Sequence, residues 1–190
     1  MNDETRLVVQ LAIGMVFLFS TPGKLMDLKG FARGLGEYRI VPESLVAFVA
    51  MTVIVAEIFL AVSHLTGWLL RIAVPVGLVI LLIFSMAVAV NLKRGQELRC
   101  YCFGASDREM ISGRTLARLL LLLAGEVILI TDANLFTANR IIRLDGIDSV
   151  AHFSLALFWA AFLLVVGGWL LNAGDAAKIL RTGIRLNRGR

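Results

Sequence analysis

The residues best suited to chemistry in this 190-residue chain are its only two cysteines, Cys100 and Cys102, with Tyr101 between them. Cα atoms that flank one residue of an extended chain lie about 7 Å apart, so a disulfide between these cysteines requires a tight turn. A strained disulfide exchanges readily with other thiols. The charge of Arg99 would favour the Cys100 thiolate, and Gly104 permits an unusual turn. This pattern is typical of a thiol–disulfide centre.

Two other interpretations of the cysteine pair stay open. A metal site would need further ligands, because two thiolates fill only half of a zinc site. The histidines His64 and His152 are expected on the opposite side of the membrane, so we predict no metal site. The cysteines could also be small residues that take no part in redox chemistry. Their place in a polar loop argues against this, because inert cysteines usually lie buried among apolar residues.

Two carboxylates, Glu57 and Glu126, fall inside apolar runs, where an ionisable residue is a functional candidate by default. At 1.5 Å per residue, Glu57 lies about 12 Å from the end of its run and Glu126 about 7–8 Å from the end of its own. Both of these ends face away from the cysteines, so we expect neither glutamate to act on the thiols. Each could be protonated and hydrogen-bonded between helices, or belong to a proton path or a quinone site.

Four other polar residues lie near the ends of apolar runs. We expect Lys24 to extend its ammonium group to the lipid headgroups. We expect His64 to be an interfacial residue at a helix end. Asn91 could cap its helix or bond to the cysteine loop. Arg118 could orient that loop or contact lipid.

The elements that must position these residues are membrane helices. The chain is 58% hydrophobic and only 17% charged, whereas soluble domains are about 45–50% apolar and about 25% charged. A membrane span needs roughly 20 apolar residues. Five runs approach this length, at residues 7–26, 45–65, 68–92, 115–130 and 150–171. The sequence therefore predicts an all-α, polytopic membrane bundle with a four-helix core and a fifth, C-terminal spanning helix.

The connections between the runs define the organisation of the chain. Residues 27–40 form an amphipathic segment that we expect to lie in the membrane interface. The loop at 93–114 is the most polar connection and contains both cysteines. We predict a four-helix domain over residues 1–131, followed over 132–190 by a polar connection, the fifth helix and a basic tail. The net charge is +5, but no basic segment is interleaved with exposed aromatic residues, so nucleic-acid binding is not expected.

The basic residues also predict an orientation in the inner (plasma) membrane. Of the 19 Lys and Arg residues, all but four fall on the side of the cysteine loop and the C-terminus; the four are Arg6, Arg71, Arg140 and Arg143. By the positive-inside rule, the cysteine side is cytoplasmic. A disulfide generator should instead face an oxidising compartment. Either basic segments on the membrane surface mislead the rule, or the cysteines serve a cytoplasmic thiol partner.

A set of residues between positions 10 and 130 resembles the MauE/DoxX group of small membrane proteins, specifically the MauE type associated with methylamine utilisation. The set comprises Gly23, Lys24, Phe31, Tyr38, Arg39, Pro42, Glu57, Gly67, Phe84, Asn91, Arg94, Gly95, residues 100–104 and Arg118. The resemblance implies a four-helix core and redox-associated work on partner proteins, such as disulfide formation beside a thioredoxin-like protein. By analogy, electrons could pass to a quinone. The alternative is a non-catalytic structural or assembly subunit of a larger membrane complex.

Overall fold

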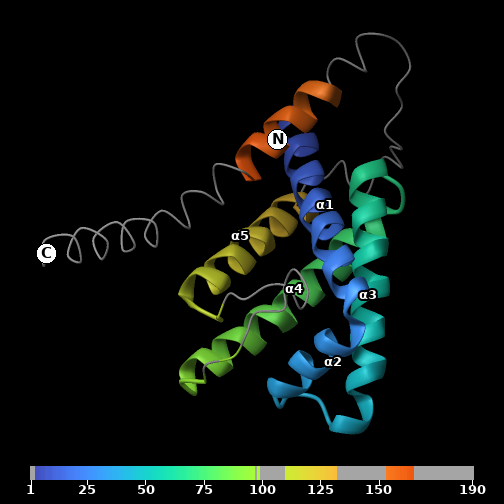
Figure 1. Cartoon of the computed structure of the whole chain (residues 1–190). Coiled ribbons are helices and arrows are strands. Elements are labelled where there is room, and N and C mark those ends of the chain that lie inside the picture. The colour runs from blue at the N-terminus through green and yellow to red at the C-terminus, as the bar shows by residue number, and fades with distance from the viewer. Residues whose placement is uncertain (1–2, 97, 99–109, 132–152, 165–190) are drawn as a thin grey trace, which may run out of the picture.

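The computed structural model describes residues 3–96, 98, 110–131 and 153–164, and this part of the chain is dominated by helices. Figure 1 shows the arrangement. The helices are α1 (Asp3–Met26), α2 (Leu28–Glu37), α3 (Glu43–Thr66), α4 (Leu70–Lys93) and α5 (Gly113–Ile130), followed by a short apolar helix at Phe153–Leu164. The predicted all-α fold is confirmed.

Three of the described helices, α1, α3 and α4, are long and apolar enough to cross a membrane. They correspond to the first three predicted runs. The fourth run is α5, whose 18 residues include Arg114, Arg118 and Glu126. Of the predicted fifth run, the structure describes only the segment at Phe153–Leu164. The chain is thus a multi-pass membrane protein, and the described residues contain three clear span candidates.

The centre of the bundle is apolar and is shared by four helices. Residues from α1, α3, α4 and α5 form one buried cluster: Ile13, Phe17, Leu60, Ala61, Leu70, Ala73, Val74, Leu81 and Leu129. Large apolar side chains such as Phe48, Met86 and Leu121 point outward and are exposed. An exterior this rich in apolar side chains indicates contact with lipid.

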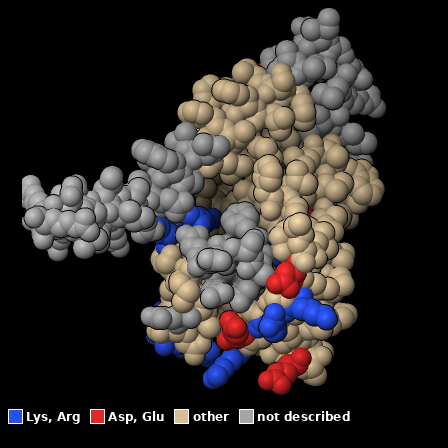
Figure 2. All heavy atoms as spheres, in the orientation of Figure 1, with Lys and Arg blue, Asp and Glu red and all other residues tan. Residues whose placement is uncertain are grey.

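The amphipathic segment forms α2, which packs against the first half of α3. Asp27 accepts a hydrogen bond from the Gly30 amide (2.8 Å) and so caps the start of α2. The apolar face of α2 contributes Phe31, which is buried with Ala50 and Ile54 of α3. Figure 2 shows that charged side chains gather at this end of the molecule. The predicted amphipathic helix therefore exists, and its apolar face contacts α3.

Candidate functional site

The cysteine-containing segment is anchored where α4 ends and α5 begins. Arg99, Cys100, Cys102 and Gly104 lie outside the described residues. On either side of them, the Ile111 amide donates a hydrogen bond to the Leu98 carbonyl oxygen (2.8 Å). The two ends of the segment are therefore joined at one place.

The start of α5 is fixed by a reciprocal cap. The Ser112 side chain accepts a hydrogen bond from the Thr115 backbone, and the Thr115 hydroxyl accepts one from the Ser112 amide (3.3 Å). This capping box satisfies backbone donors that a helix start leaves free. Arg118, the residue expected to orient the loop, lies in the second turn of α5 and is half-buried.

Asn91 links the end of α4 to the chain after α2. Its side chain is fully buried, and its amide nitrogen donates to the Ala87 carbonyl oxygen (2.9 Å) and, more weakly, to that of Tyr38 (3.5 Å). The backbone carbonyl oxygen of Asn91 accepts a hydrogen bond from the Gln96 backbone amide (3.2 Å). The Asn91 backbone thus fixes the turn that leads from α4 to the cysteine segment. Its side chain forms hydrogen bonds with α4 and with Tyr38.

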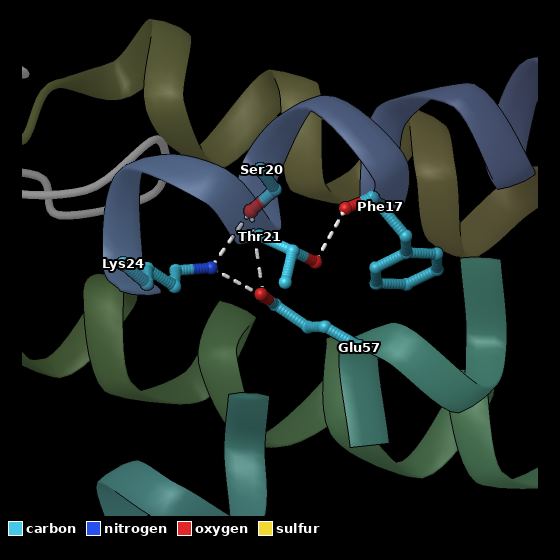
Figure 3. A network of polar contacts seen from close by, with 5 residues as sticks. All are labelled: Phe17, Ser20, Thr21, Lys24 and Glu57. Carbon is cyan, nitrogen blue, oxygen red and sulfur yellow. Dashed lines mark hydrogen bonds and ion pairs between the residues drawn. The ribbon is translucent and has the colours of Figure 1, made fainter. Parts of the chain in front are cut away.

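A buried ion pair joins α1 to α3 (Figure 3). The Lys24 ammonium group contacts the Glu57 carboxylate at Oε1 and also donates to the Ser20 hydroxyl oxygen (2.7 Å). Ser20 lies 3.4 Å from the same carboxylate oxygen. The Phe31 ring centroid lies 5.4 Å from Lys24 Nζ, so α2 contributes a cation–π contact. Residues from three helices therefore surround one ammonium group.

The expectation that Lys24 extends to the headgroups is wrong. Lys24 is only 2% exposed and Glu57 only 3%. Glu57 lies about 21 Å along α3 from its start at Glu43, at 1.5 Å per residue, so the pair is deep in the bundle. Lys24 turns inward because Glu57 offers an opposite charge there, and the pair is neutral as a unit. Its sequence position near the end of an apolar run gave no sign of this partner.

A second buried polar cluster lies toward the other end of the bundle. It contains His64 of α3 and Glu126 of α5, both 0% exposed, with His64 Nε2 3.3 Å from Glu126 Oε1. The Gln10 amide nitrogen of α1 donates to the His64 carbonyl oxygen (2.6 Å). The prediction of an interfacial His64 is therefore wrong, because α1 and α5 cover that end of α3.

The two glutamates belong to different clusters. Glu57 pairs with Lys24 across the α1–α3 contact, whereas Glu126 faces His64. On α3, Glu57 and His64 are two turns apart, about 10 Å. An open groove on the described surface contains neither glutamate; it has a volume of about 390 Å³ and is lined by Phe48, Met51, Thr52, Val55, Ala56 and Phe59. Among the described residues, no group of three or more His, Cys, Asp or Glu could hold a metal ion.

A comparison with known families matches residues 3–131 to the family described as Methylamine utilisation protein MauE. The chain belongs to the MauE family. The match extends from α1 to α5 and so includes both polar clusters and the cysteine segment. The family resemblance seen in the sequence is confirmed, and the family points to a membrane protein in methylamine utilisation. Neither the curated proteins nor the solved structures compared with the chain gave a significant match.

Proposed function

We propose that this MauE-family protein is a membrane thiol–disulfide protein that assists disulfide formation in, or maturation of, a partner protein through Cys100 and Cys102. The observation that supports it is the Cys-Tyr-Cys sequence in a segment whose ends are joined by the Leu98–Ile111 hydrogen bond. Such an anchor would present the cysteines to a partner from a fixed place on the bundle.

The proposed reaction is thiol–disulfide exchange. A thiolate of the partner attacks the Cys100–Cys102 disulfide, which gives a mixed disulfide and one free thiol. The second partner thiolate then attacks the mixed disulfide, so the partner gains a disulfide and both cysteines become thiols. Two electrons and two protons move to this chain. Another turnover needs a two-electron oxidant, for which we propose a quinone dissolved in the lipid. A thioredoxin-like protein is the kind of partner that such chemistry suits.

Thiol labelling in opened cells, where the reagent reaches both sides of the membrane, tests this proposal. Because the chain has two cysteines and no others, a membrane-impermeant maleimide reports on this segment alone. We expect labelling only after reduction, and loss of the partner's disulfides in the Cys100→Ser and Cys102→Ser variants. A Ser106→Ala variant in the same segment provides a control for loop changes that leave the thiols intact. Equal labelling with and without reductant, together with intact partner disulfides in both variants, would refute the proposal.

The same labelling tests orientation. The charge pattern predicts a cytoplasmic segment, which the impermeant reagent would reach only after the cells are opened. Labelling of intact reduced cells would place the cysteines on the outer side, where an oxidising compartment favours disulfides.

A second candidate is a non-catalytic subunit or assembly factor of a larger membrane complex. Three exposed aromatic residues of the Phe153–Leu164 helix favour it: Phe158, Trp159 and Phe162 contact one another in stacked and edge-to-face pairs. Aromatic side chains are enriched in protein interfaces. Co-purification in fixed stoichiometry with a large partner, unchanged by the two Cys→Ser substitutions, would favour this function over the first.

A further inference from the structure

Four helices contribute to the environment of one buried carboxyl group at Glu126. His64 of α3 faces it, Gln10 of α1 bonds to the His64 backbone, and Gly77 of α4 lies directly against the carboxylate. His64 and Glu126 are both fully buried. Gly77 lies about 21 Å along α4 from Asn91, so this cluster is remote from the base of the cysteine segment.

The hydrogen bond at the other ring nitrogen determines the state of His64. Its Nδ1 lies 2.8 Å from the Leu60 carbonyl oxygen. A carbonyl oxygen can only accept, so Nδ1 carries a hydrogen. In a neutral ring with that hydrogen, Nε2 has a lone pair and lies 3.3 Å from Glu126 Oε1, although the two atoms are not aligned as a hydrogen bond.

Three protonation states of the pair are then possible. With no further proton, a lone pair faces an ionised carboxylate, and the buried pair carries a net negative charge. With two further protons, a net positive charge is buried and both facing atoms carry hydrogens. With one further proton, the pair is neutral, and that proton lies between Nε2 and the carboxyl group. Burial of a net charge is strongly unfavourable. We propose that His64 and Glu126 form a proton-binding site that holds this one proton.

No hydrogen-bond donor in the described part of the chain takes the place of the proton at Glu126. Neither oxygen of Glu126 accepts a hydrogen bond from the described part of the chain. The Gln10 amide is engaged with the His64 backbone. Arg6, one turn before Gln10 on the same face of α1, is also buried, and its charge disfavours a second excess proton on the pair. Arg71 of α4 is exposed. Loss of the proton would leave a bare carboxylate where four helices meet.

Gly77 is required for this geometry. A Cβ atom at position 77 would overlap the Glu126 carboxylate, so any other residue there displaces the carboxyl group from His64. Gly125 is adjacent to Glu126, but a Cβ atom there approaches the flexible tip of Ile13 (3.0 Å) and makes an ordinary contact with Val9 (3.5 Å), not with the carboxylate. The Gly77→Ala and Gly125→Ala variants therefore make the same chemical change with different effects on the pair.

Spectroscopy on the intact chain tests the site. The chain has two histidines, so a His152→Gln background leaves His64 as the one ¹⁵N-labelled imidazole. At neutral pH we expect one of two results, which differ in the side chain that carries the shared proton. Either the His64 ring is an imidazolium, or it is a neutral ring protonated at Nδ1. In the second case we also expect an infrared band of a protonated carboxyl group that Glu126→Gln removes. A neutral ring together with an ionised Glu126 would overturn the proposal.

The glycine variants provide the second measurement. We expect Gly125→Ala to retain the His64 spectrum and Gly77→Ala to change it. If Gly77→Ala leaves both the imidazole shifts and the carboxyl band unaltered, the two side chains do not share a proton. The measurement on the unsubstituted pair decides the question even where Gly77→Ala fails to fold. None of these measurements depends on the cysteines, so their outcome is separate from that of the labelling experiment.

Discussion

Replacement of Lys24 by Met should strongly destabilise the bundle, because it removes the charge opposite Glu57. Lys24 is 2% exposed, and its ammonium group contacts both Glu57 and Ser20. Without it, Glu57 retains only the 3.4 Å contact with Ser20. Removal of one partner of a buried pair typically costs about 3–5 kcal/mol. Because Glu57 stays within the membrane in the unfolded chain as well, we expect the lower end, about 3 kcal/mol.

The assay is reversible denaturant unfolding in mixed micelles, followed by circular dichroism and extrapolated to zero denaturant. The Lys29→Met variant is the matched control, since Lys29 is exposed on α2, and it should change stability by no more than about 0.5 kcal/mol. The double variant Lys24→Met/Glu57→Leu removes both charges and should recover most of the loss, since an apolar pair can replace a buried ion pair. If Lys24→Met costs no more than Lys29→Met, the buried pair does not hold α1 against α3.

Two further predictions concern the helix ends around the cysteine segment and use the same unfolding assay. Gly95→Ala should lower the free energy of unfolding by about 1 kcal/mol because Gly95 has φ +64°, although a Cβ atom there meets nothing within 4 Å. Gly113→Ala, also in open space but without a positive φ, is the control and should be neutral or slightly stabilising. Equal losses of stability in the two variants would contradict this reasoning. Ser112→Ala should lower the free energy of unfolding by about 1 kcal/mol because it removes the capping box of α5. Ser44→Ala, at an exposed position of α3, is the control and should have little effect. A Ser112→Ala variant as stable as the parent would show that the capping box does not stabilise α5.

The helices could be predicted from the sequence because each is determined by local composition. Apolar runs long enough for a span predicted α1, α3 and α4, and the amphipathic segment at residues 27–40 predicted α2. Helix formation depends on residues within a few turns of each other, so a single sequence contains the necessary information.

The partners of polar residues could not be predicted in the same way. Lys24 and Glu57 are 33 residues apart, and His64 and Glu126 are further apart still. The sequence identified both glutamates as unusual, but it assigned Lys24 and His64 to the membrane surface because each lies near the end of an apolar run. Nothing in the sequence indicated a role for Gln10 or Gly77, since an amide or a glycine in an apolar run has no distinctive pattern.

The sequence by itself determined that this is a helical membrane protein of the MauE type with a single Cys-Tyr-Cys segment, because length, hydropathy and short motifs are properties of neighbouring residues. Only the tertiary structure decided which charges meet. A buried ionisable side chain must find a partner of opposite charge or share a proton, and that partner is supplied by whichever helix packs beside it. The packing of α1 and α5 around α3 therefore made Lys24 the partner of Glu57 and His64 the partner of Glu126.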